Sequence, residues 1–146
     1  MKATGAEFAV VYRCCVLPLG IAKMELSEFE HRVIDAMISG DPDEGVLRNQ
    51  LCLATVTERN YTDVGVFAKL NAPVSAMRTK MTNRLIQTTP MVYLTHPKLP
   101  QGAQAMLLFH NALMSTLECL AFDEDWPEDE SKFTVEPYGS LPTSDA

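Results

Sequence analysis

The spacing of apolar residues changes once along the chain, and this change constrains the fold more than any other feature. Between residues 28 and 51, apolar side chains recur every three or four positions, as on one side of a helix. From residue 53 to residue 120 they recur mostly at every second position, as on one face of a strand. We therefore predict an α+β fold, with two N-terminal helices packed on one face of a mostly antiparallel, four- to five-stranded sheet.

The predicted helices have recognisable start and stop signals. Ser27 and Glu30 match the capping box, in which each side chain satisfies a backbone N–H of the other. Gly40 suits the left-handed residue that follows the last turn. A second helix is predicted over residues 41–51, because its first residues supply a capping Asp and a first-turn Pro. The apolar stripe of the first helix consists of Phe29, Val33, Ile34, Met37 and Ile38.

The strand-forming half has less regular boundaries. Residues 55–57 and 64–70 predict two strands or one long bent strand, and Gly65 within them indicates a bulge or a close backbone approach. Residues 91–95 predict a short strand. The segments 103–109 and 113–120 predict two central strands joined by a hairpin turn, in which Asn111 can take a positive φ.

The remaining segments suggest how the domain is bounded. Residues 71–90 are basic and form a long excursion between strands. Residues 1–23 are predicted to be an N-terminal extension, because a well-formed helix start follows Met24. Residues 24–127 then form a single domain. Residues 128–146 are rich in acids, prolines and small residues, and they predict an acidic flexible tail.

Charge and composition exclude several classes of partner. The net charge is -7, but residues 123–146 hold eight acidic residues and one lysine, so the rest of the chain is neutral. A nucleic-acid partner is not expected, because the body has no excess of basic residues. A membrane is not expected either, because no apolar run reaches the roughly 18 residues needed to span a bilayer. The four cysteines show no CxxC spacing, which favours reduced thiols and a cytoplasmic location.

No common catalytic, phosphate-binding or metal-binding motif occurs in the chain. We therefore expect no cofactor and no metal, and the leading hypothesis is a non-catalytic interaction module that binds a protein partner or itself, for instance as a homodimer. The alternative is a small-molecule-binding protein or enzyme with a pocket between sheet and helices. Its candidate lining residues are Glu118, Tyr61 and Phe67.

Glu118 attracts attention because it interrupts an apolar strand, and a buried carboxylate must be paired or have a raised pKa. If it points inward, Arg59 or Arg84 would be its partner; the other possibility is that it points outward. A dyad with His110 is excluded by the expected hairpin. Pairing of residues 110 and 113 places Glu118 opposite Ala105, roughly 17 Å from His110 at about 3.3 Å per residue.

Three segments, MELSEFEHRVIDAMISGD, VTERNYTDVGVFAKL and LECLAFDEDWP, resemble a family of small uncharacterised bacterial proteins. The shared features are a helix pair, a strand centred on Val64-Gly65-Val66-Phe67, and an "LE…WP" segment. The resemblance covers residues 24–127 and departs from the pattern at Ala112, where the hairpin turn usually has glycine. It implies that the domain starts at Met24, and it implies no activity.

Overall fold

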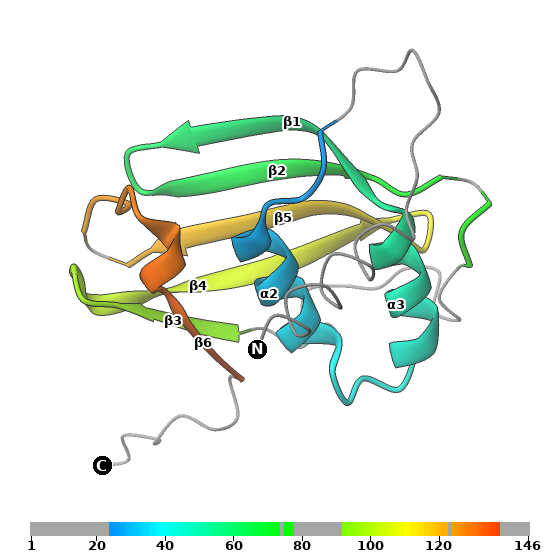
Figure 1. Ribbon diagram of the computed structural model, residues 1–146, viewed down its shortest axis with the longest axis horizontal. Coiled ribbons are helices and arrows are strands. Elements are labelled where there is room, and N and C mark those ends of the chain that lie inside the picture. Colours follow the sequence, from blue (N-terminus) through cyan, green and yellow to red (C-terminus); the bar gives the residue numbers. More distant parts are fainter. Residues whose placement is uncertain (1–23, 74, 78–91, 123, 138–146) are drawn as a thin grey trace, which may run out of the picture.

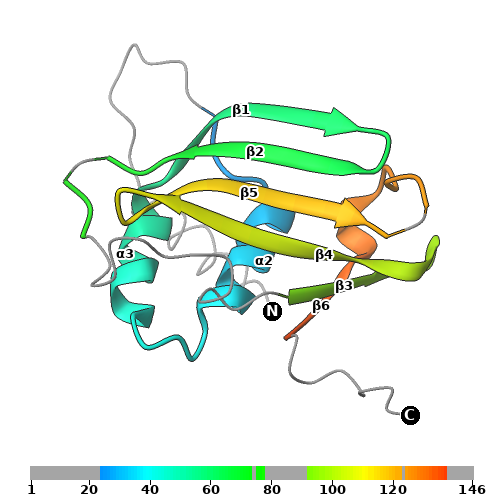
Figure 2. The same cartoon turned by 180° about the vertical axis from the view of Figure 1, so that it is seen from behind.

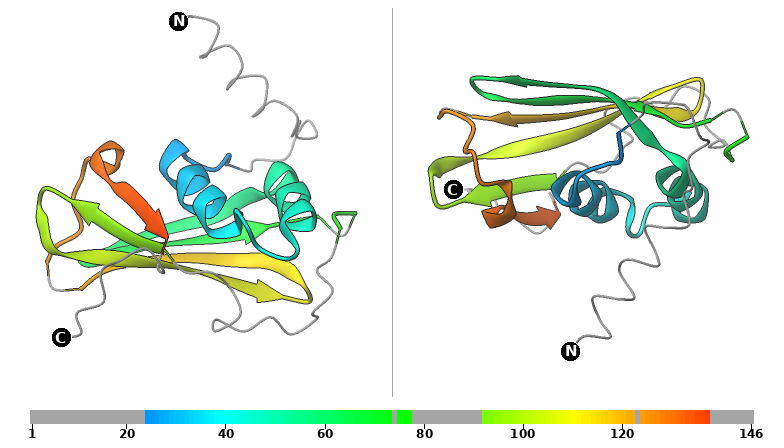
Figure 3. Two further views of the ribbon diagram at one scale, coloured as in Figure 1. Left: turned by 90° about the horizontal axis from the view of Figure 1, so that it is seen from below. Right: turned by 45° about the horizontal axis from the view of Figure 1, so that its top comes forward.

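The computed structural model describes residues 24–73, 75–77, 92–122 and 124–137 (Figure 1). These residues form one six-stranded antiparallel sheet with two helices on one of its faces (Figures 1 and 3). The predicted α+β class, with the helices on one face of an antiparallel sheet, is confirmed. The sheet has one or two strands more than the predicted four to five.

Helix α2 (Glu28–Ile38) starts where its capping box predicts. Ser27 Oγ accepts a hydrogen bond from the Glu30 backbone N–H at 3.1 Å, and Glu30 Oε1 accepts one from the Ser27 N–H at 2.8 Å. After the helix, Gly40 has the expected left-handed conformation, with φ of 82°. The predicted apolar stripe of Phe29, Val33, Ile34, Met37 and Ile38 is buried against the sheet.

Helix α3 (Glu44–Leu53) starts later than predicted. The Asp41 carbonyl accepts from the Glu44 N–H at 2.9 Å, while the Asp41 carboxylate accepts from the Asp43 N–H at 2.8 Å. Asp41 therefore stabilises a turn that precedes the helix, and Pro42 lies in that turn instead of at the first helical position.

The sheet has the strand order β1-β2-β5-β4-β3-β6. Seen from the far side, β1 and β2 form one hairpin beside the longer hairpin of β4 and β5 (Figure 2). The segment predicted as two strands or one bent strand is thus two strands. The strand bounds are Thr55–Thr62 for β1, Gly65–Asn71 for β2, Val92–His96 for β3, Leu99–His110 for β4, Leu113–Ala121 for β5 and Thr134–Pro137 for β6.

Gly65 permits the close approach of β2 and β5. A Cβ atom at this position would lie 2.0 Å from the Cys119 carbonyl oxygen, which no side chain tolerates. The close backbone approach predicted for this glycine is therefore present. The only irregularity in the β1–β2 register lies elsewhere, between Val56 and Glu58.

The β4–β5 hairpin has the predicted turn, with His110 paired to Leu113. Asn111 and Ala112 have φ values of 54° and 65°, so both central residues are left-handed. Glu118, however, lies opposite Met106 instead of Ala105. The reason is a register shift between Leu108 and Phe109, whose partners Thr116 and Met114 leave Ser115 as one extra residue on β5.

The chain continues to pack beyond Pro127, where the sequence predicted a flexible tail to begin. A short 3₁₀ helix, η2 (Glu130–Lys132), precedes β6, which pairs with β3. Between them Phe133 is 3% exposed, and its ring lies 5.0 Å from that of Phe29 and 4.8 Å from that of Trp126. This aromatic packing anchors residues that are otherwise acidic and polar. The predicted extension (1–23), most of the basic excursion (78–90) and residues 138–146 lie outside the described residues.

Candidate functional site

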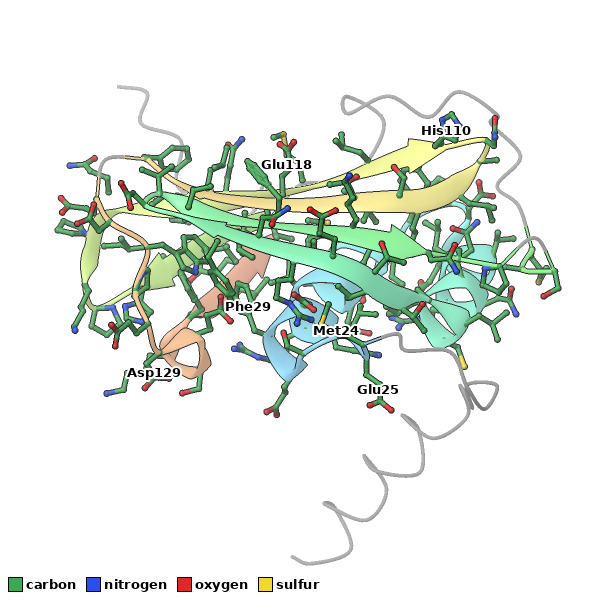
Figure 4. All side chains as sticks on the ribbon, turned by 90° about the horizontal axis from the view of Figure 1, so that it is seen from above. Met24, Glu25, Phe29, His110, Glu118 and Asp129 are labelled. Carbon is green, nitrogen blue, oxygen red and sulfur yellow. The ribbon has the colours of Figure 1, made fainter. Side chains whose placement is uncertain are left out.

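The two faces of the sheet differ in what covers them. Along β5 the buried side chains are Met114, Leu117, Cys119 and Ala121, which face the helices. The residues between them, including Glu118, face the other way and are partly exposed. Figure 4 shows Glu118 on the side of the sheet opposite to α2. Among the described helices none lies on that side, which we call the open face.

The open face is defined by three rows of side chains that run across the strands. Residues paired across an antiparallel ladder point to the same face, so the register of the strands gives each row. The first row is Leu120, Gln104 and Tyr93; the second is Asn60, Phe67, Glu118 and Met106; the third is Glu58, Lys69, Thr116 and Leu108.

Apolar side chains form much of this face. Phe67, Met106, Leu108 and Leu120 are all partly exposed. At one end the rings of Tyr93 and Phe122 stack with their centroids 6.2 Å apart, and Phe122 is 47% exposed. Apolar side chains that gather on a sheet face without a covering helix make that face a candidate surface for contact with another protein.

Two of the three residues predicted to bind a ligand lie together on this face. Phe67 and Glu118 are direct neighbours across β2 and β5. Within the described residues Glu118 forms no hydrogen bond or ion pair, so a single carboxylate stands in the middle of the apolar rows. His110 lies on β4 well away from Glu118 (Figure 4), as the hairpin predicted.

Tyr61, the third predicted residue, lies on the opposite face. It is paired with Val66, whose side chain is buried under the helices. Its hydroxyl donates to the Glu130 carboxylate at 3.2 Å, and the same carboxylate accepts from Trp126 Nε1 at 3.0 Å. Burial of the hydroxyl, together with the negative charge of Glu130, raises the pKa of Tyr61 to about 12 although 58% of the residue is exposed.

Arg59, which the sequence offered as a partner for an inward Glu118, instead binds Glu30. Its Nε and Nη2 donate to the two oxygens of the Glu30 carboxylate at 2.6 and 2.8 Å. Glu30 is 2% exposed and also caps α2, so this ion pair joins the helix to β1. The shift at Thr57 causes this arrangement, because it turns Arg59 and Tyr61 toward the helices and Glu58 away from them.

A cavity of about 280 Å³ lies beside the N-terminus of α2. None of the three predicted ligand-binding residues lines it. Arg32, one of its walls, donates to the backbone carbonyls of Phe133 (3.0 Å) and Glu130 (3.3 Å), which ties α2 to η2. Its lining residues are Ser27, Glu28, Phe29, Arg32, Glu130 and Ser131.

The two edges of the sheet are poorly suited to pairing with another strand. β1 is bridged at Val56 by Met24, through hydrogen bonds of 3.1 and 2.8 Å, and its next residue is the bulge. Arg59 then points a charge inward from this edge. At the other edge β6 has four residues and ends in Pro137. Short edges, bulges, prolines and inward charges all oppose strand addition.

Cys119 is a free, fully buried thiol, and burial raises its pKa well above the usual value, so it packs as a small apolar side chain. No three His, Cys, Asp or Glu side chains within the described residues gather as a metal site. None of the described helices is long and apolar enough to cross a membrane.

Comparison with known proteins gives no match to a family model, to a curated protein or to a solved structure. The resemblance suggested by the sequence is therefore not supported, and the chain is assigned to no family.

Sequence reasoning singled out Glu118 and Phe67 but missed the apolar residues around them. The signal was present in β4, where Ala105, Met106, Leu107, Leu108 and Phe109 are all apolar. An uninterrupted apolar run in a strand indicates that both of its faces are to be covered. The described helices cover only one.

Proposed function

We propose that the protein is a non-catalytic interaction module that binds a protein surface through the open face of its sheet. One observation carries the proposal. The central strand β4 buries Leu107 under the helices and presents Met106 and Leu108 on the opposite side, where no described helix packs. An antiparallel sheet that faces water on one side normally alternates apolar and polar residues, and β4 does not.

The blunted edges support the same proposal by elimination. Partners reach a sheet either by adding a strand to its edge or by packing on its face. Here β1 and β6 oppose addition, which leaves the face as the surface fitted for contact.

Photocross-linking tests the proposal. A benzophenone amino acid is placed at Met106 on the open face or, as a control, at Glu25, which is exposed beside the start of α2. We expect protein adducts, with a second copy or another protein, from position 106 and not from position 25. A further substitution, Leu120→Lys, places a charge on the same face and should abolish them. Equal adducts from both positions, or adducts that survive Leu120→Lys, contradict the proposal.

The alternative, a small-molecule pocket between sheet and helices, has less support. Its three candidate residues are divided between the two faces, with Glu118 and Phe67 on one and Tyr61 on the other. A cytoplasmic location stays a prediction.

A further inference from the structure

We infer that the occupant of the open face is a second copy of this chain, packed face to face, with Lys69 of each copy over Glu118 of the other. This inference rests on the function proposed above and names its partner. The observations that carry it are the charges on the face, their spacing and the area available.

The charges on the face are few and of both signs. Lys69 is the only lysine or arginine in the three rows, and Glu58 and Glu118 are the only acids. In the monomer Lys69 Nζ lies 3.5 Å from Glu58, and both side chains are at least half exposed. Such an exposed ion pair contributes little to stability, so Lys69 can exchange it for another partner. Glu118 has no ion pair to give up within the described residues.

The spacing of the two charges is compatible with two-fold symmetry. Lys69 lies opposite Thr116, and Glu118 lies opposite Phe67, so the charges are diagonal neighbours, with their Cα atoms about 8 Å apart. A two-fold axis that lies between the two sheets and bisects this diagonal places each charge over its opposite in the second copy. Both contacts form together, as an isologous interface requires.

The same axis also sets how the two sheets cross. With strands about 4.8 Å apart and about 3.3 Å per residue, the diagonal makes roughly 35° with the strand direction. A two-fold axis perpendicular to the diagonal makes the strands of the two copies cross at an angle of roughly 70°. This is close to the orthogonal class of sheet packing, in which strands cross at about 90°.

The area of the face and the crossing angle together set the size of the contact between the two copies. The nine residues of β5 extend over about 30 Å, and the four strands β2, β5, β4 and β3 are about 19 Å wide. Two such faces that cross at roughly 70° overlap over about 400 Å² per copy before the relief of the side chains is counted, about half of the roughly 800 Å² per partner of a standard specific interface. The partly exposed apolar residues would become its core and the two ion pairs would fix its orientation.

A charge-swap experiment on the full chain tests this inference. Sedimentation velocity is run on the wild type, on Lys69→Glu, on Glu118→Lys and on the double variant Lys69→Glu/Glu118→Lys. We expect a wild-type dimer of about twice the 16.2 kDa chain mass. Each single swap should weaken it by at least about tenfold in Kd, because like charges then meet twice. The double variant should return to within about threefold of the wild type. Glu58→Gln is the matched control, because it removes the partner of Lys69 within the chain and should leave the dimer intact.

Circular dichroism and thermal melting establish that each variant folds, which the exposure of both sites favours. The inference is overturned by a monomeric wild type, or by single swaps that weaken the dimer when the double variant does not restore it. These results are distinguishable from failure of the proposed function. A monomer that still gives adducts with another protein from position 106 retains the interaction module and loses only the homodimer.

Discussion

Gln50 connects helix α3 to the β4–β5 turn, and its replacement should show how strongly the fold depends on one buried amide. The side chain is 0% exposed. Its Nε2 donates to the carbonyls of Met77 (2.8 Å) and Ala112 (2.9 Å), and its Oε1 accepts from the Met114 N–H (2.9 Å). Gln50→Met keeps the approximate volume and removes all three bonds, so the effect of a cavity is small.

The magnitude follows from the groups left behind. In the variant the Met114 N–H and the Ala112 carbonyl remain buried without their partner. Each such group costs about 1–3 kcal/mol, so we expect the free energy of unfolding to fall by about 2–6 kcal/mol. This is a large share of the roughly 5–15 kcal/mol that stabilises an ordinary domain. The turn between β4 and β5 should loosen first, since Ala112 holds a left-handed φ there.

Urea unfolding measures the effect, followed by fluorescence of Trp126, the single tryptophan. Asn49→Ala is the matched control. Its Oδ1 accepts from the Met77 N–H at 2.8 Å, but at an exposed site, where water replaces the lost bond. We expect the control to lose less than about 1 kcal/mol. If Gln50→Met loses no more than Asn49→Ala, the reasoning that places a buried clamp at Gln50 is refuted.

Three other results are expected. Phe133→Ala should lower the free energy of unfolding by about 3–5 kcal/mol and weaken the near-ultraviolet dichroism of the aromatic cluster; an unchanged spectrum would contradict its anchoring role. Arg59→Met leaves Glu30 buried and unpaired, so it should lower the free energy of unfolding, measured in urea, by about 3–5 kcal/mol. The double variant Arg59→Met/Glu30→Gln should recover part of this loss, because the buried charge is then removed. Tyr61, with its pKa raised to about 12, stabilises the fold fully below pH 10, and this contribution disappears as the pH rises toward 12. The pKa of Tyr61 is measured as the difference between the absorbance titrations of the wild type and of Tyr61→Phe at 295 nm. A pKa of about 10 for Tyr61 would refute its contact with Glu130.

The local signals in the sequence predicted the elements well where one strong interaction determines them. The capping box fixed the start of α2 at Ser27, and the left-handed preference of Asn111 fixed the hairpin turn. The helical and alternating spacings then gave the α+β class. In each case the decisive contact lies within a few residues of sequence, so local reasoning is sufficient.

The missed features depend on contacts between residues distant in sequence. β6 has four residues in an acidic segment, and it forms because Phe133 packs on Phe29, about a hundred positions earlier. Phe67 and Tyr61 lie on different faces because of the bulge in β1, and no residue type near Thr57 predicts a bulge there. Local spacing predicts which residues alternate along one strand, but it does not predict the register between strands.

The bulge at Thr57 also makes the length of β1 as important as its composition. Successive side chains on a strand point to opposite faces of the sheet, and the extra residue shifts this alternation by one position after Val56. If these same residues formed an unbroken ladder without the bulge, Glu58 and Asn60 would point into the core and Arg59 and Tyr61 into solvent. Homologous strands should therefore have either the bulge at this point or one residue fewer before Glu58, because both arrangements keep Arg59 and Tyr61 toward the helices.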